Sequence, residues 1–138
     1  VDVEASLNNN HFATYRGDGV VVSTATGSTA YSLSLGGAIL SPSSNNMIIK
    51  PIASHTSLLG GLVMESDAKL TLKADSREDL SITVDGFIDT QLREFDYIEV
   101  QVDDSKTVNF VRSHDFKSEY WNSLAKKLEL RKGESLGR

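Results

Sequence analysis

The sequence predicts a mainly β fold, a layered domain like a β-sandwich with two helical segments. Short runs rich in β-branched and aromatic residues recur along most of the 138 residues, with turn residues between them. Residues 69–74 alternate polar and apolar side chains, as in a strand with one face in water. Asp85-Gly86 separates two further runs, and this pair is a strong signal for a two-residue hairpin. Together these observations predict a sandwich-like class.

The predicted strands follow one another in order along the chain. Residues 1–5 and 11–16 flank Asn8-Asn9-Asn10, and asparagine tolerates the left-handed backbone of a hairpin turn. Residues 20–24 (VVVST) form a continuous β-branched run, which predicts a strand buried on both faces. The remaining predicted strands are 47–53, 62–65, 69–74, 80–84, 87–92, 97–102 and 107–112.

Two segments interrupt the strand pattern. Residues 28–36 predict a short helix, which begins near Ser28 or Thr29 as its N-cap and ends at a pair of glycines. Residues 115–128 predict a longer helix, because apolar side chains recur every four residues along one face: Phe116, Tyr120, Leu124 and Leu128.

The composition excludes several classes of protein. Hydrophobic residues make up 39% and charged residues 24% of the chain, as in an ordinary globular domain. The net charge is −5, whereas a nucleic-acid binder normally has a basic face. No apolar run approaches the ~20 residues that cross a bilayer. The chain has no cysteine, which is compatible with the cytoplasm, and its three scattered histidines predict no zinc site.

The segment after the first β-branched run is rich in small hydroxylated residues. Eight of the twelve residues from Ser23 to Ser34 carry a hydroxyl. Small residues let a ligand approach the backbone, and the first N–H groups of a helix have no partner inside it. Such a loop suits the polar or anionic groups of a nucleotide. It is not a Walker loop, because no Gly-Lys-Ser/Thr follows. From local physics alone, a capped helix with a Ser/Thr-rich entry fits equally well.

Asp18 lies between two glycines just before the same strand. Asp-Gly pairs are common in turns, so a plain turn is the simpler interpretation. The order of turn, buried strand and hydroxyl-rich loop favours a functional one. An extended strand of five residues would separate the turn from the loop by ~16–20 Å, so both could contact opposite ends of a dinucleotide.

The run from Tyr15 to Ser32, YRGDGVVVSTATGSTAYS, resembles the signature of the NAD kinase family. The combination of Gly-Asp-Gly with Thr-Gly-Ser-Thr-Ala-Tyr is highly specific, although neither half is specific alone. The resemblance covers residues 1–130 in order. Further matching segments are 35–40 (LGGAIL), 51–55 (PIASH), 84–86 (VDG) and 112–116 (RSHDF).

The resemblance implies a transferase that phosphorylates the adenosine 2′-hydroxyl of NAD to give NADP, using ATP or polyphosphate and a divalent cation such as Mg²⁺. Members of the family have an amino-terminal α/β domain with a Gly-Gly-Asp-Gly motif, whose aspartate is the proposed general base. Their carboxy-terminal β domain binds NAD and builds the oligomer. This chain lacks the motif and begins with Val1 rather than Met. We therefore expect 1–130 to be the carboxy-terminal domain, 131–138 a polar tail, and the isolated chain to be inactive.

The resemblance also implies binding roles for NAD. Asp18 matches the residue that hydrogen-bonds the nicotinamide carboxamide. Ala53 matches a residue that reaches NAD from a neighbouring subunit, which implies a homo-oligomer such as a tetramer. Thr29 and Ala30 match residues around the adenine, and Thr26 lies in the same loop. Tyr31 and Ser34 match residues that line the same dinucleotide pocket. No residue of this chain is assigned a catalytic or metal-binding role.

The sequence departs from the family at two places. Ala25 stands where proline is usual, and Gly60-Gly61 where many members have Arg-Pro, so the charge contribution of that loop is open. The role of His55 is also open. Two alternative functions remain: the β domain of a related lipid-kinase-type protein, against which the intact Thr-Gly-Ser-Thr-Ala-Tyr run argues, and a non-catalytic nucleotide-binding or assembly module.

Overall fold

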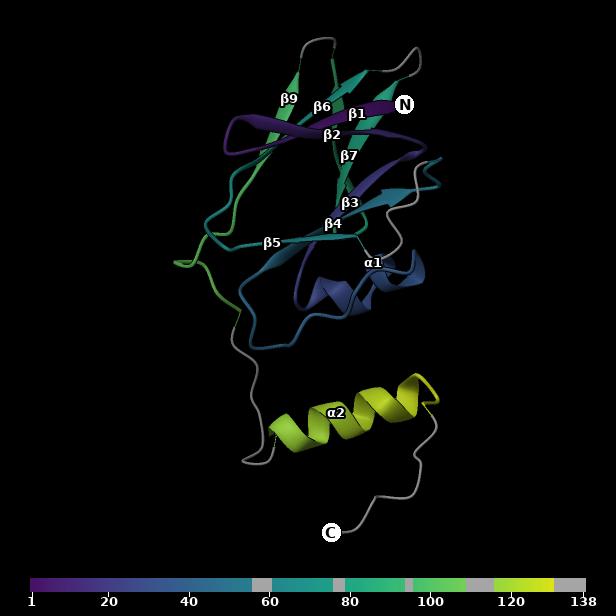
Figure 1. Cartoon of the computed structure of the whole chain (residues 1–138), viewed down its shortest axis with the longest axis vertical. Coiled ribbons are helices and arrows are strands. Elements are labelled where there is room, and N and C mark those ends of the chain that lie inside the picture. Colours follow the sequence, from purple (N-terminus) through teal and green to yellow (C-terminus); the bar gives the residue numbers. More distant parts are fainter. Residues whose placement is uncertain (56–60, 76–78, 94–95, 109–115, 131–138) are drawn as a thin grey trace. The chain divides into compact units, whose positions relative to one another are not determined.

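The computed structural model describes residues 1–55, 61–75, 79–93, 96–108 and 116–130. The chain divides into two units, Val1–Asp103 and Asp104–Arg138 (Figure 1). In the described ranges, the first unit holds every strand and the two short helical segments, and the second holds the helix α2. The mainly β class predicted from the sequence is confirmed.

The larger sheet has four antiparallel strands in the order β2-β1-β6-β9. Asn8 and Asn9 turn the chain between the first two strands with φ values of 49° and 67°, which confirms the predicted hairpin. Asn8 also ties this turn to β6, because its side-chain oxygen accepts the N–H of Lys69 at 3.0 Å. The strands are β1 (Asp2–Leu7), β2 (Asn10–Arg16), β6 (Leu70–Asp75) and β9 (Tyr97–Val100).

The smaller sheet has three antiparallel strands in the order β3-β4-β5: β3 (Gly19–Thr24), β4 (Met47–Ile52) and β5 (Leu62–Met64). The strand predicted over 20–24 is present, but the expectation that it is buried on both faces is wrong. Its residues are half-buried or exposed, whereas β4 is buried from Met47 to Pro51. The reason is position: β4 lies between two strands, and β3 lies at the edge of its sheet.

The core lies between these two sheets, which confirms the predicted layered arrangement. Alternate residues of β1 and β6 meet alternate residues of β4, as the period of two in a strand requires. The buried side chains of this cluster are Val3, Ala5, Tyr15, Met47, Ile49, Met64, Ala68, Leu70 and Leu72. Ile48 points to the opposite face of β4 and packs with Ala25 and Leu40 in a second, smaller cluster.

The predicted short helix over 28–36 is divided in two. A 3₁₀ turn, η1 (Gly27–Thr29), is followed by one turn of α-helix, α1 (Tyr31–Ser34). Ala30 separates them with φ −102° and ψ −125°, outside the helical region. The expected side-chain cap is absent from both elements. The reason is that the hydroxyls of Ser28 and Thr29 donate back to carbonyl oxygens three residues earlier.

The strands β7 (Leu80–Val84) and β8 (Phe87–Leu92) form a two-stranded ribbon. Asp85 and Gly86 turn it with φ values of 48° and 88°, which confirms the predicted hairpin. Of the strand expected over 107–112, residues 107 and 108 have no strand conformation, and the rest lies outside the described residues.

The helix α2 (Phe116–Lys127) confirms the predicted longer helix. Residue 115, where that helix was expected to begin, lies outside the described residues. No helix in the described part of the chain is long and apolar enough to cross a membrane.

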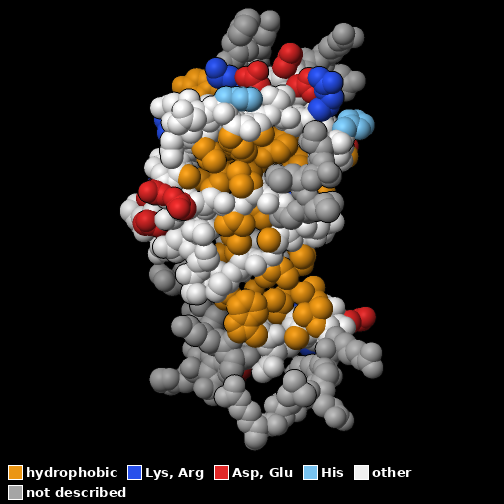
Figure 2. All heavy atoms as spheres, in the orientation of Figure 1, with side chains coloured by type: hydrophobic (Ala, Val, Ile, Leu, Met, Phe, Trp, Pro, Cys, Tyr) orange, Lys and Arg blue, Asp and Glu red, His pale blue; other side chains and the backbone are white. Residues whose placement is uncertain are grey.

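The first unit, Val1–Asp103, is called the β unit from here on, and apolar side chains are unevenly distributed over its surface. On the face shown in Figure 2, hydrophobic side chains of this unit gather in its middle, and charged side chains gather at one end. Large hydrophobic residues of the unit are exposed in several elements, and two of them flank the turn of the ribbon: Val84 (55%) and Phe87 (79%).

Candidate dinucleotide-binding site

The Gly-Asp-Gly turn is held by backbone hydrogen bonds at the junction of β2 and β3. The N–H of Asp18 donates to the carbonyl oxygen of Ile52 at 2.9 Å, and the N–H of Gly17 donates to the carbonyl oxygen of Val1 at 3.1 Å. A Cβ on Gly17 would lie 2.4 Å from that same oxygen of Ile52, so a side chain has no room there. The turn thus fixes the backbone of Asp18, while its carboxylate is exposed.

The loop after β4 lies beside this turn. Gly19 pairs with Ile52 in the β3–β4 ladder, so Ala53 follows next to Asp18. Ala53 has φ 46°, and the N–H of His55 then donates to the carbonyl oxygen of Arg16 at 3.1 Å. Ala53 and His55 are both exposed. Two predicted site residues, Asp18 and Ala53, therefore meet within one chain at the same end of β3.

The remaining predicted residues lie at the other end of β3. Thr24 ends the strand opposite Met47, and the hydroxyl-rich loop begins immediately after it. The loop is pressed against the strand, because a Cβ on Gly27 would be 3.0 Å from the Cβ of Ser23. Five predicted residues share this end and are all exposed: Thr26, Thr29, Ala30, Tyr31 and Ser34.

The predicted site residues therefore form two groups, one at each end of β3. The six residues of β3 span roughly 20 Å at the usual rise per residue. Each end offers a different chemistry: a carboxylate at Asp18, and hydroxyls beside small residues at the loop. An extended ligand with an amide at one end and a polar ring system at the other would suit this pair.

Carboxylates are absent from the loop and its neighbours in sequence. The chain has no Asp or Glu between Asp18 and Glu65, and this stretch includes all of β3, η1, α1 and β4. A hydroxyl-rich loop without a carboxylate can bind a ribose or adenine but offers no general base of the usual kind. Among the described residues, no three His, Asp or Glu side chains gather in a group that could hold a metal ion.

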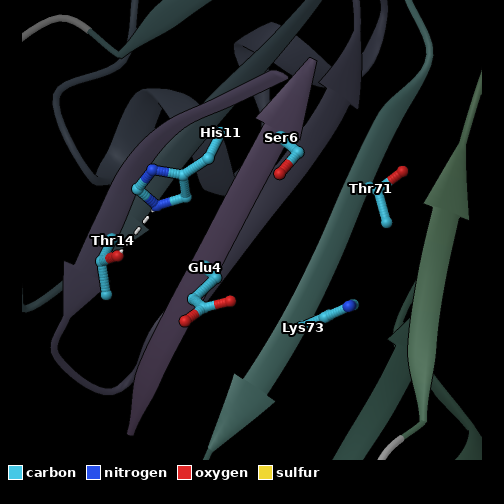
Figure 3. A pocket seen from close by; sticks show the side chains of 6 residues that line it. All are labelled: Glu4, Ser6, His11, Thr14, Thr71 and Lys73. Atoms are coloured by element: carbon cyan, nitrogen blue, oxygen red, sulfur yellow. Dashed lines mark hydrogen bonds between the residues drawn. The ribbon is translucent and has the colours of Figure 1, made fainter. Parts of the chain in front are cut away.

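A hollow lies on the outer face of the larger sheet (Figure 3). It is lined by side chains from β1, β2 and β6: Glu4, Ser6, His11, Thr14, Thr71 and Lys73. His11 Nε2 lies 3.1 Å from Thr14 Oγ1, and Glu4 is the cross-strand neighbour of Lys73. None of the predicted NAD residues lines this hollow, and alternating charged and polar residues are ordinary on the solvated face of a sheet.

Comparison with known proteins decides the family. The sequence profile of the ATP-NAD kinase C-terminal domain matches residues 1–113. The chain belongs to this family. The predicted recognition is thereby confirmed, and the lipid-kinase-type alternative loses its support.

Curated relatives agree with the family assignment. A protein named NAD kinase from Dehalococcoides mccartyi is 38% identical over 110 residues, which are 80% of this chain and 38% of the relative. Another NAD kinase, from Geotalea daltonii, is 33% identical over 130 residues, or 94% of this chain and 45% of the relative. The chain thus spans less than half the length of these relatives.

Solved structures of the family share the fold. The yeast NADH kinase complexed with NADH superposes with a TM-score of 0.78 at 23% identity, covering 99% of this chain and 40% of that one. An NAD kinase from Archaeoglobus fulgidus in complex with ATP gives 0.71 at 20% identity, covering 89% and 47%. At these identities the similarity establishes the arrangement of strands.

Sequence reasoning missed the structural roles of several residues in and around the site. Ile52 supplies the carbonyl oxygen for Asp18, and Ser28 was considered only as a helix cap. Gly61 was noted only as a departure from Arg-Pro, yet it has φ +78° and a Cβ there would be 2.8 Å from the carbonyl oxygen of Ile49. Its neighbour Gly60 lies outside the described residues. No local signal identifies these roles, because each depends on a partner distant in sequence or on a backbone angle.

Proposed function

We propose that this chain is the NAD-binding and assembly domain of an NAD kinase, which transfers a phosphoryl group to the adenosine 2′-hydroxyl of NAD and yields NADP. The observation that carries the proposal is the placement of the Gly-Asp-Gly turn and the hydroxyl-rich loop at opposite ends of β3, in a chain of this family. The names of the relatives support it, as do the NADH and the ATP with which the two solved structures are complexed.

The nicotinamide end of NAD is assigned to Asp18. Its carboxylate is exposed, and the hydrogen bond from its N–H to Ile52 holds the backbone in place. A carboxylate accepts hydrogen bonds only, so it matches the NH₂ donor of a carboxamide. The resemblance to the family supports the same assignment.

The adenosine end is assigned to the loop and α1. Thr26 and Thr29 present hydroxyls, and Ala30 lets the ligand approach the backbone. Tyr31 is 55% exposed and offers an aromatic face for stacking. Ser34 lies one turn further along α1.

Catalysis requires more than this chain supplies. Phosphoryl transfer to a hydroxyl needs a positioned base and a triphosphate held by a metal ion. Mg²⁺, when bound, neutralises charge on the phosphates. Because the stretch from β3 to β4 contains no carboxylate, the proposal assigns the base, the Mg²⁺ and the ATP or polyphosphate donor to the remainder of the protein.

Assembly is proposed to run through the β unit, as a homo-oligomer such as a tetramer in the cytoplasm. Exposed apolar area of the unit, including Val84 and Phe87, supports an interaction surface. In the described part of the chain, β2, β3 and β5 each pair with a strand on one side, and such strand edges support it as well, because they are usually paired or covered. Ala53 is proposed to contact NAD bound by a neighbouring subunit.

The decisive experiment compares this chain with a longer protein that joins it to the amino-terminal domain of a relative. The longer protein should make NADP from NAD, ATP and Mg²⁺, and the isolated chain should make none. An inactive but folded and NAD-binding longer protein would instead favour the non-catalytic binding module. Activity of the isolated chain, purified free of host kinase, would contradict the assignment of the base to the other domain.

A further inference from the structure

Ser28 is a fully buried polar residue in the 3₁₀ turn η1 of the hydroxyl-rich loop. Its exposed fraction is 0%. Its hydroxyl donates to the carbonyl oxygen of Ala25 at 2.6 Å and accepts the N–H of Leu40 at 3.0 Å. A serine hydroxyl has one proton to donate, and here it is used while an oxygen lone pair also accepts. The side chain is therefore bonded in both directions inside the protein.

The two hydrogen bonds of Ser28 join three segments that are not paired with one another in a β-sheet. Ala25 follows β3, Ser28 lies in η1, and Leu40 lies in the irregular segment between α1 and β4. Leu40 and Ala25 are themselves buried, at 8% and 6% exposure, and pack with Ile48 of β4. Buried backbone groups outside sheets and helices need side-chain partners, and for Leu40 that partner is Ser28.

The neighbours of Ser28 in the loop are exposed to solvent, whereas Ser28 itself is buried. Thr26 and Thr29 are exposed, as are Ala30 and Tyr31. The loop is closed on itself by two further bonds: Ala30 N–H to Gly27 at 3.0 Å, and the Thr29 hydroxyl to Thr26 at 3.2 Å. Those bonds shape the loop, and the bond that Ser28 accepts from Leu40 ties it to the segment at Leu40, beside the apolar packing of Ala25 against Leu40 and Ile48.

We propose that Ser28 is the positioning residue of the adenosine half of the site: its hydroxyl holds the loop in the conformation that receives adenosine before the ligand arrives. The inference rests on the proposed function. A loop that is already ordered spares the ligand the entropy cost of ordering it, so the loss of Ser28 appears as lost affinity. The nicotinamide half, held by Asp18 and Ile52 at the far end of β3, does not depend on Ser28.

The test uses the longer protein and measures binding of NAD and of two overlapping fragments, ADP-ribose, which carries the adenosine, and nicotinamide mononucleotide, which carries the nicotinamide. Binding of the fragments is measured by competition with NAD. Ser28→Ala removes both hydrogen bonds of the hydroxyl and should weaken binding of NAD and ADP-ribose roughly tenfold to a hundredfold. Nicotinamide mononucleotide should bind as before. Amide exchange at Leu40 should accelerate, since its N–H has lost its acceptor.

Two further variants separate positioning from general stability. Leu72→Val thins the core between the sheets without touching the loop, and it should leave all three affinities unchanged. Ser28→Cys nearly keeps the side-chain volume but bonds weakly, and it provides a folded variant if Ser28→Ala does not fold. Ser28→Cys should weaken binding of the same two ligands, NAD and ADP-ribose, by a smaller factor than Ser28→Ala.

The possible outcomes show whether the role of Ser28 fails by itself or together with the proposed NAD-binding function. If the unaltered protein binds no NAD, the proposed function fails and the inference fails with it. If it binds NAD, and the folded Ser28 variants bind ADP-ribose as tightly as it does, only the inference is overturned. Equal losses for ADP-ribose and nicotinamide mononucleotide, or equal losses in Leu72→Val, would also overturn it, because they indicate a general loss of stability.

Discussion

The main-chain N–H of Asp18 donates to the carbonyl oxygen of Ile52 across 2.9 Å. This bond lies just beyond the Gly19–Ile52 pair at which the β3–β4 ladder ends. Its consequence is that the carboxylate of Asp18 is presented from a fixed backbone, next to the loop that carries Ala53. The backbone of Asp18 and its side chain therefore have separate tasks, and substitutions can test them separately.

Asp18→Asn tests the side chain. The substitution keeps the N–H bond to Ile52, so the free energy of unfolding should change by only about 0.5 kcal/mol, as at other exposed sites. The affinity for NAD should fall roughly tenfold to a hundredfold, the usual effect of a lost charged hydrogen bond. Calorimetric titration and urea unfolding measure the two quantities. Asp85→Asn makes the same change in another exposed Asp-Gly turn and should leave NAD binding intact. Equal affinities in all three proteins would make Asp18 a turn residue only.

Gly17→Ala tests the backbone. The new Cβ would lie 2.4 Å from the carbonyl oxygen of Ile52 and 3.0 Å from the Cα of Ser54, both main-chain atoms. Forcing them apart should cost about 1–3 kcal/mol of stability and weaken NAD binding, because it displaces the acceptor of Asp18. Gly86→Ala is the control: its Cβ has open space but its φ is +88°, so about 1–2 kcal/mol is lost without an effect on NAD. Unchanged NAD affinity in Gly17→Ala would contradict the role of the bond.

The pair formed by Asp2 and Arg16 predicts a pH dependence of stability. Arg16 Nε lies 2.7 Å from Asp2 Oδ1, and Nη2 lies 2.7 Å from Oδ2. This hydrogen-bonded pairing lowers the pKa of Asp2 below its ordinary 3.8. Because the folded pKa is the lower one, the contribution to stability is present above pH 3.8 and is lost as the pH falls through the folded value.

Asp2→Asn should therefore flatten the acidic limb of a plot of urea midpoint against pH. High salt should reduce the difference from the unaltered chain, because both groups are exposed to solvent and screened. Parallel acidic limbs for the two proteins would show that the pair contributes nothing in solution, as is common for surface ion pairs.

Assembly can be tested by light scattering at micromolar concentration. The expected mass is a multiple of 15.0 kDa, and a mass of 15.0 kDa alone would contradict an oligomer. Ala53→Asp should lower both the mass and the affinity for NAD, because it places a charge where the neighbouring subunit is proposed to meet the ligand. Asn9→Asp introduces the same residue at another exposed position of positive φ and should change neither.

Local chemistry explains what could be predicted from the sequence. The Asn8-Asn9 and Asp85-Gly86 turns were predictable because these residues accept positive φ with little regard to their surroundings. The helix over Phe116–Lys127 was predictable from its period. The combined Gly-Asp-Gly and Thr-Gly-Ser-Thr-Ala-Tyr runs identified the family without any structure, and the sequence profile confirmed it.

Only the tertiary structure decided burial and partnership. Val20 to Val22 have the more strand-like composition, yet β4 is the buried strand because it has neighbours on both sides. Ser28 resembles a helix cap in sequence, but its hydroxyl accepts a bond from Leu40, twelve residues away. A side chain's bonding partner is whichever group the fold brings within reach, and residue type alone does not specify that group. For the same reason, the sequence placed Asp18 in a turn, whereas the fold placed Ala53 beside it.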